Sequence, residues 1–514
     1  MASARQPPAA TAPASGPALT RALGFREALS LVVGRIIGSG IFRTPGPIMA
    51  LTGGATLFFG VWVLAGAMTI LSALCYAEMV AMLPRSGGPY AYLKAAYPPW
   101  WAFLRGWAMF FVSETATIAA VALVFAEYAR TLWESGGGAG WPRGLETAAA
   151  AGGVWLLTWI NVRGVREGGR AQNALTVLKL AALAAVAWVG LTAARGAAPA
   201  GAATPLASPS GWAAVLAVGA SLRYAFFAFS GWEGATYVAE EVREPERNLP
   251  RSLLLGIAVV MATYLLVNAA YLRQLGPAGM AGAKQVAADA MRSALGPAGA
   301  ALIALAVVLS TFGNINAQVL VKARTWHAMA RDGLFPAVFG GVHPRHRTPV
   351  GALVAQGIWA TVLLVAAGLA GRSYETVIDF FAFTSAVFNL STFAAVAVLR
   401  RRLPDAPRPF RVPGWPWTLG VVLVIQAAFL VVTAITAPLP SLLGAGLTLT
   451  GLVWYFRRGR PRAPDPAGIR PRVQGGGGGG SPARPAGSVP SCLRSPPRWP
   501  AWGDCARLHG RRHR

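Results

Sequence analysis

Apolar blocks of about twenty residues constrain this chain more than any other feature of its sequence. A helix of about twenty residues crosses the roughly 30 Å hydrocarbon core of a bilayer, and only 13% of the residues are charged, against about 25% in soluble domains. We therefore predict an all-α polytopic membrane protein with twelve transmembrane helices. The expected spans are 27–51, 55–83, 101–132, 145–162, 172–194, 212–239, 252–275, 298–323, 349–370, 376–399, 416–435 and 438–456.

The basic residues between the spans predict the orientation of the chain. On one side the connections carry 21 Lys and Arg, with Lys322 among them, and on the other side they carry seven. Because cytoplasmic connections hold the excess of basic residues, both termini are expected in the cytoplasm. An arginine-dominated, alanine-rich composition suggests a bacterial genome rich in G and C, so the inner (cytoplasmic) membrane is the expected location.

The two ends of the chain differ in composition from the apolar blocks. Residues 1–22 are mostly Ala, Pro, Ser and Thr and do not resemble a signal peptide, whereas residues 457–514 are rich in Pro, Gly and Arg. We predict two disordered tails, the first of them cytoplasmic, with attraction of the basic tail to anionic lipid as an alternative. Much of the net charge of +27 lies in this tail and in short loops, so it indicates no nucleic-acid partner.

The sequence offers little for an enzyme, a cofactor or a metal. None of the four lysines follows a glycine, which excludes a phosphate-binding Gly-x-x-x-x-Gly-Lys motif. The five histidines contain no His-Glu-x-x-His pair and lie at the cytoplasmic edge or in the tail. We therefore expect no catalytic residues, no cofactor and no metal site, and the lipid bilayer is the expected surroundings.

Two of the expected spans are interrupted near their middle. Gly38-Ser39-Gly40 interrupts the first span, and Ser230-Gly231 interrupts the sixth. Paired glycines favour unwinding of a helix, and free backbone groups at membrane depth are tolerated where they line a cavity or are buried in protein. Because the two spans are five apart, they suggest inverted repeats with a site at the midplane, while close helix packing through small residues is the alternative.

Five groups of short motifs occur in order between residues 25 and 412. They are Gly34-Arg35-Ile36-Ile37-Gly38-Ser39-Gly40-Ile41-Phe42; Tyr76-Ala77-Glu78 with Pro84-Arg85-Ser86-Gly87-Gly88-Pro89-Tyr90; Asn161-Val162-Arg163-Gly164; Glu240-Glu241 with Pro245, Arg247 and Pro250; and Ser310-Thr311-Phe312-Gly313. Together they resemble the amino acid–polyamine–organocation superfamily, especially its L-amino acid transporter branch.

The resemblance implies a LeuT-like core of two inverted five-helix repeats with broken helices 1 and 6. The first repeat is expected over 23–200, the second over 201–412, and two further helices over 413–456.

The resemblance also implies a substrate held mainly by backbone atoms of Gly38, Ser39, Gly40, Ser230 and Gly231. The amides of Ser39 and Gly40 would receive the carboxylate, which suits a helix N-terminus.

On the other side of the substrate, the carbonyls of Ile36, Phe227 and Ala228 would accept the α-ammonium group. Phe227 resembles the aromatic gate of the family, and Tyr264 resembles a tyrosine that hydrogen-bonds near the site. Ordinary packing remains the alternative for each ring.

Lys179 is the only lysine that the sequence places deep within a span. The resemblance implies that its ammonium group replaces a sodium ion, with the carbonyls of Gly34 and Ile37 and the hydroxyls of Ser310 and Thr311 as partners. Sodium independence would follow. The alternative is a side chain that snorkels to the membrane surface.

Two charged residues depart from the pattern of the family. Arg35 would bring a second cation to the first break, where it could pair with Glu114 or Glu233 or face the cytoplasmic vestibule. Glu233 has the spacing of a capping box with Ser230, and the alternative is a direct role in reading the substrate side chain.

We therefore expect a sodium-independent carrier of neutral L-amino acids that works by alternating access, with exchange, uniport and proton symport left open. A proton-coupled permease for cationic amino acids or polyamines is the alternative within transport, and a membrane sensor or scaffold is the alternative outside it. An accessory subunit is expected to be absent, because the composition is bacterial.

Overall fold

The computed structural model describes most of the chain between residues 21 and 457. The described residues are 21, 23–85, 87–138, 140–142, 144–163, 168–194, 206–343, 346, 348–369 and 374–457. The predicted N-terminal tail, apart from Arg21, and the C-terminal tail after Arg457 lie outside them, as does the expected boundary between the two repeats at residue 200. In the described part the elements are helices, with one isolated β-bridge between Leu23 and Val242.

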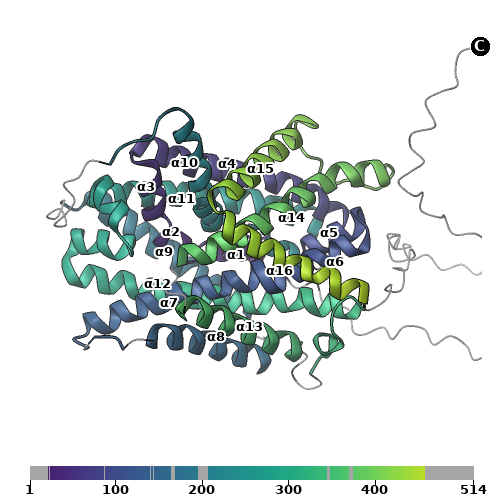
Figure 1. Cartoon of the computed structure of the whole chain (residues 1–514), viewed down its shortest axis with the longest axis horizontal. Helices are drawn as coiled ribbons and strands as arrows, with labels where there is room; N and C mark the ends of the chain where they lie inside the picture. The colour runs from purple at the N-terminus through teal and green to yellow at the C-terminus, as the bar shows by residue number, and fades with distance from the viewer. Residues whose placement is uncertain are drawn as a thin grey trace, which may run out of the picture. The chain divides into compact units, whose positions relative to one another are not determined.

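Helices of very different length make up the described chain (Figure 1). They are α1 (Phe25–Ile36), α2 (Gly40–Arg43), α3 (Pro45–Thr52), α4 (Ala55–Met82), α5 (Pro89–Ala96), α6 (Pro99–Ala108), η1 (Met109–Ser113), α7 (Glu114–Ser135), α8 (Leu145–Arg163), α9 (Gly168–Thr192), α10 (Gly211–Phe229), η2 (Trp232–Glu241), α11 (Pro245–Gly282), α12 (Val286–Arg331), η3 (Ala337–Gly340), α13 (Val350–Leu369), α14 (Tyr374–Arg402), α15 (Trp417–Thr436) and α16 (Pro438–Arg457).

Nine helical segments of the described chain are long and apolar enough to cross a membrane. This agrees with a polytopic membrane protein, whereas the predicted count of twelve spans stays a prediction. The other three expected spans coincide with the interrupted series α1 to α3, with α8, and with α9, whose apolar part is Thr176–Thr192. Several helices exceed their expected spans, and α12 is the longest of them at 46 residues.

The first expected span is broken where the Gly-Ser-Gly motif lies. α1 ends at Ile36, and helical structure resumes at Gly40 with α2. The sixth span breaks after Phe229, and the chain continues as the 3₁₀ helix η2. α1 packs against η2 while α2 packs against α10, so the two broken helices lie side by side with their breaks at the same level.

The helices around the two breaks form the interior of the described bundle. α11 packs against α4, α9 and α1, and α12 packs against α7 and α9. In Figure 1, α7, α8, α12, α13 and α16 run along a common direction. Side chains of α7, α9, α11 and α12 approach the breaks from several sides.

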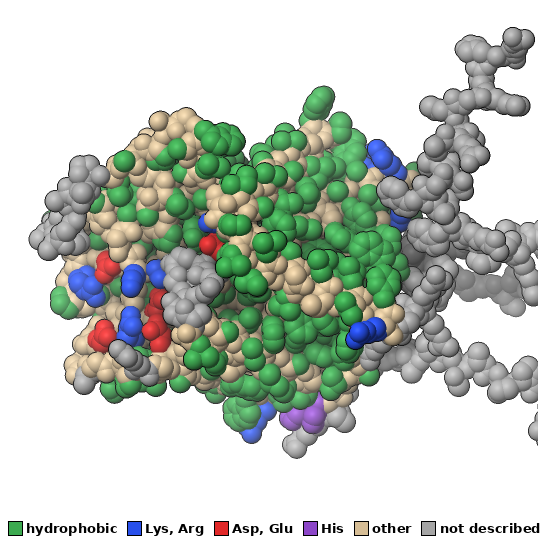
Figure 2. Space-filling view, in the orientation of Figure 1, with side chains coloured by type: hydrophobic (Ala, Val, Ile, Leu, Met, Phe, Trp, Pro, Cys, Tyr) green, Lys and Arg blue, Asp and Glu red, His purple; other side chains and the backbone are tan. Residues whose placement is uncertain are grey.

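The outer surface carries the apolar side chains expected of a protein in lipid. Over α14, α15 and α16, hydrophobic side chains cover most of the visible face, and Val424 and Leu442 are among the exposed ones (Figure 2). On this face the edge with α5 and the end of α16 shows basic side chains without acidic ones. The opposite edge, where α7 ends and α12 begins, shows both signs of charge.

Candidate functional site

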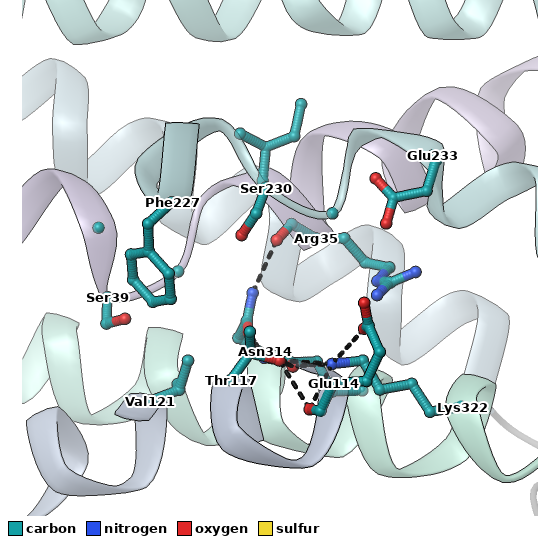
Figure 3. A pocket seen from close by; sticks show the side chains of 15 residues that line it. Arg35, Ser39, Glu114, Thr117, Val121, Phe227, Ser230, Glu233, Asn314 and Lys322 are labelled. Carbon is teal, nitrogen blue, oxygen red and sulfur yellow. Dashed lines mark hydrogen bonds and ion pairs between the residues drawn. The ribbon is translucent and has the colours of Figure 1, made fainter. Parts of the chain in front are cut away.

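A pocket with an empty volume of about 450 Å³ lies at the two helix breaks (Figure 3). It brings together nine of the residues singled out in the sequence: Arg35, Ile36, Gly38, Ser39, Gly40, Phe227, Ser230, Gly231 and Glu233. Six further residues complete its lining: Glu114, which was considered above as a partner of Arg35, Thr117, Val121, Asn314, Gln318 and Lys322. Ala228 and Tyr264 do not line this pocket, and neither do Gly34, Ile37, Lys179, Ser310 and Thr311.

The break in the first span leaves backbone donors free in the pocket. Within the described residues, no backbone carbonyl accepts a hydrogen bond from the amides of Gly38, Ser39 or Gly40. The hydroxyl of Ser39 is also buried without a partner in the described chain, and the ring of Phe227 points into the same space (Figure 3). The first residues of a helix present such N–H groups together with a partial positive charge, an arrangement that suits an anionic group.

Lys179 provides hydrogen bonds to carbonyl groups at the C-terminal end of α1 that have no partner within the helix. Its ammonium nitrogen donates to the carbonyl of Gly34 at 3.1 Å and to that of Ile37 at 3.0 Å. The hydroxyls that the resemblance adds do not join it: Thr311 donates to carbonyls of its own helix, and Ser310 has no hydrogen-bond partner in the described chain. The lysine is 4% exposed, so it does not snorkel to the surface.

Two further side chains hold the remaining carbonyls at the end of α1. The amide nitrogen of Asn314 donates to Arg35 O at 2.9 Å. The hydroxyl of Tyr264 lies 3.1 Å from both Ile36 O and Ala228 O, so it joins the two broken helices behind the pocket. The last carbonyls of a helix have no partner within it, and here α9, α11 and α12 supply the partners instead.

Glycines allow the two breaks to approach each other closely. A Cβ atom on Gly40 would lie 2.4 Å from the Cα of Ala228, so only glycine fits there without a shift of backbone. At Gly38 a Cβ atom would meet the amide nitrogen of Asn314 at 2.8 Å, which is the movable end of a side chain. Gly231 has φ of 94°, a left-handed conformation that favours glycine.

Arg35 brings a buried charge into the pocket from the last turn of α1. Its guanidinium group points toward Glu233 and Glu114, with which it interacts electrostatically (Figure 3). Gly234 makes room for this side chain, because a Cβ atom there would lie 2.4 Å from Arg35 Cδ. Gly231 is the N-cap residue of η2 and no side chain caps this end, so the capping box considered for Glu233 is not formed.

Lys322 corrects an expectation from the sequence. It was assigned to a cytoplasmic connection, yet it is 1% exposed and lies in the pocket, so Lys179 is not the only deeply buried lysine. Its nitrogen lies 2.8 Å from the Glu114 carboxylate and also donates to Thr117 at 2.6 Å and to Gln318. A charged partner with further hydrogen bonds offsets the cost of burying this ammonium group.

The sequence contains a pattern that indicates the polar residues around Lys322, although a hydropathy window does not detect it. Asn314, Gln318 and Lys322 are spaced by four residues, which places them on one face of α12. Glu114 directly follows the π-helical turn η1, and such turns occur frequently at functional sites.

A second cavity, of about 940 Å³, adjoins the first. Five residues line both cavities: Glu114, Thr117, Phe227, Ser230 and Glu233. Its other walls combine aromatic side chains, among them Tyr76, Phe381 and Phe429, with polar ones that include Arg105 and Arg223. The first cavity presents backbone groups of the helix breaks, and the second, larger cavity is lined by side chains.

Comparisons with known proteins give one consistent result. A family model described as amino acid permease matches residues 23–456. The "Large neutral amino acids transporter small subunit 2" of Homo sapiens is 32% identical over 87% of this chain and 82% of its own length. The human "Asc-type amino acid transporter 1" and "b(0,+)-type amino acid transporter 1" are each 31% identical over 85% of this chain, which covers 82% and 88% of them.

These relatives correct the expectation that an accessory subunit is absent. The first of the human proteins is by its name a small subunit, and therefore part of a larger assembly. The bacterial composition on which the expectation rested carries no information about subunits. All of these relatives are transporters by name, in agreement with the expectation that the chain is no enzyme.

Proposed function

We propose that this chain, which belongs to the amino acid permease family of the amino acid–polyamine–organocation superfamily, is a sodium-independent carrier of neutral L-amino acids. The match over residues 23–456 and the names of the relatives make it a multi-pass membrane protein of amino acid transport. The substrate class, the independence from sodium and the form of the cycle are the proposal.

The free amides at the first break are the observation that carries the substrate assignment. Ser39 and Gly40 would bind the carboxylate of an amino acid, because their N–H groups have no partner in the described backbone and line the pocket. The carbonyls of Ile36 and Phe227, which belong to lining residues, would accept the ammonium group through their second lone pairs, since each already accepts one hydrogen bond. Ala228 lies outside the lining, so its carbonyl is left out of this assignment.

The charges in the first pocket favour neutral over cationic substrates. Glu114 is paired with Lys322, and Glu233 faces Arg35, so each acidic side chain already has a basic one beside it. A substrate with a cationic side chain would have to compete with these bonds. The proton-coupled carrier of cationic amino acids or polyamines is therefore the second candidate, with Glu233 as its acid.

Lys179 supports independence from sodium. Its side-chain nitrogen donates to the carbonyls of Gly34 and Ile37 and so takes up these acceptors. A sodium ion at this place would need the same carbonyls and would have to displace the lysine from them.

The first experiment is uptake of labelled alanine and leucine by proteoliposomes that contain the full chain, in sodium-free buffer. We expect saturable uptake that added sodium does not increase, and trapped amino acid will show whether the cycle is an exchange. Uptake that requires sodium would overturn the proposal. Stronger competition by arginine or putrescine than by leucine would favour the second candidate.

The chain is further proposed to work as a subunit of a larger assembly, as the name of its human relative says of that protein. Among the described residues the one cysteine, Cys75, is buried, so a disulfide to a partner from this part of the chain is excluded. Native electrophoresis of solubilised membranes tests the assembly. A single 53.6 kDa chain without a second polypeptide would contradict it.

A further inference from the structure

Arg105 is a cation of the second cavity that forms no ion pair in the described chain, although Glu114 and Glu233 interact with it electrostatically. Its side chain lines the cavity and is 4% exposed, yet Nε and Nη1 have no hydrogen-bond partner in the described chain. The ring of Phe388 lies 5.6 Å from its Cζ atom, which is a cation–π contact and satisfies none of the N–H groups. A guanidinium group carries five donors, and buried donors are normally paired.

Among the described charges at the two cavities, the basic side chains outnumber the acidic ones by one. Lys322 forms an ion pair with Glu114 at 2.8 Å, and Arg223 forms one with Asp379 at 3.0 Å. Arg35 points toward Glu233, which is the remaining acid of the lining. Within the described lining, one positive charge therefore has no counterpart. A zwitterion held at the helix breaks would not change this balance, because its own charges cancel.

The second cavity lies where the side chain of a bound amino acid would extend. Phe227, Ser230 and Glu233 line both cavities, so the space beside the free amides continues directly into the larger one. Its volume of about 940 Å³ leaves ample room for a side chain. The lining holds polar side chains such as Ser72 and Asn389 beside the aromatic ones, yet none of them accepts a hydrogen bond from Nε or Nη1 of Arg105, so these donors are left for a group that enters the cavity.

We propose that the second cavity is a side-chain subsite in which Arg105 binds a terminal oxygen acceptor of the substrate, the C=O group that a carboxamide and a carboxylate share. This inference rests on the proposed function, since it concerns the side chain of the same amino acid. A planar guanidinium group matches such an oxygen in a directed hydrogen bond. Substrates with a hydrocarbon side chain of the same length leave its donors unpaired and are selected against.

The test compares competitors of labelled leucine uptake in proteoliposomes that contain the full chain. Glutamine and glutamate supply the terminal oxygen, and norleucine is the hydrocarbon control of similar length. For the wild type we expect glutamine or glutamate to compete at a concentration at least tenfold lower than norleucine. The ratio of the norleucine concentration to the glutamine or glutamate concentration that halves leucine uptake should fall at least tenfold in Arg105→Met. Arg105→Lys should give an intermediate ratio.

The ratio of two competitors does not depend on how much folded carrier each preparation contains. Arg401→Met, which removes an exposed arginine at the end of α14, is the matched control and should keep the wild-type ratio. If Arg105→Met carries too little leucine to measure, the thermal shifts that glutamine and norleucine induce in the purified variant replace the uptake ratio.

The outcomes separate the inference from the proposed function. Wild-type leucine uptake with equal competition by glutamine, glutamate and norleucine would overturn the role of Arg105 and leave the proposed function standing. Absence of leucine uptake by the wild type would overturn the proposed function itself. A ratio that changes when gluconate replaces chloride would show that Arg105 holds a mobile anion, which also overturns the inference.

Discussion

Lys179 occupies the place where the first break would otherwise leave two carbonyl groups unpaired. In Lys179→Ala these carbonyls lose their donor inside a buried site, so we expect leucine uptake to fall at least tenfold. Lys94→Ala is the control, because the ion pair of Lys94 with Asp332 is about one-third exposed and should matter little. Wild-type transport by Lys179→Ala would rule out its role as a substitute for sodium.

Gly40 and Gly38 make a second comparison between single residues. Gly40→Ala places a methyl group against the backbone of Ala228, whereas Gly38→Ala places it against the movable amide of Asn314. We expect the melting temperature in detergent to fall more for Gly40→Ala than for Gly38→Ala. Equal melting temperatures would show that the two breaks can separate at little cost. Because Gly40 packs so tightly, loss of transport in Gly40→Leu alone would not establish contact with substrate.

Sequence reasoning identified the glycines and backbone groups of the pocket better than its charges. The paired glycines alone predicted the helix breaks. The resemblance of the motifs to a known family then implied which backbone groups at the breaks bind substrate. Lys322 was assigned to a loop because a count of basic residues treats the end of a span as surface. Arg105 was not singled out, because its surroundings depend on α14, which is distant in the sequence.

At the scale of elements, the pair of Lys322 and Glu114 joins α12 to α7 inside the bundle. Removing one partner leaves a buried charge, so Lys322→Met should reduce the free energy of unfolding by about 3 to 5 kcal/mol. The double variant Lys322→Met with Glu114→Gln should recover much of this loss. Thermal unfolding of the four proteins in a double-mutant cycle measures the coupling. Additive losses would mean that the two residues act separately.

The apolar blocks predicted the positions of most long helices, since each block must be helical in lipid. They did not predict the ends of α11 and α12, which extend well beyond their apolar parts. The short helix α5 and the π-helical turn η1 were also missed. Both depend on packing against neighbouring helices, and a hydropathy window does not register such contacts.

At the scale of the whole molecule, the distribution of basic residues predicts which ends face the cytoplasm. A cysteine introduced at Arg401, at the exposed end of α14, should react with an impermeant maleimide only from the cytoplasmic side. A cysteine at Gly137, after α7, should react from the outside. Cys492 and Cys505 are first replaced by serine, and buried Cys75 serves as the unreactive background. The reverse labelling would contradict the predicted orientation.

The pairing of acids and bases in the first pocket also determines how a carrier of this kind responds to voltage. Because Glu114 and Glu233 keep their basic partners, the pocket has the same net charge when it is empty and when it holds a zwitterion. The membrane potential then does no work on an accumulated neutral amino acid. A substrate with an added carboxylate would carry one charge, worth about 2.3 kcal/mol per 100 mV, and a potential negative inside would oppose its entry.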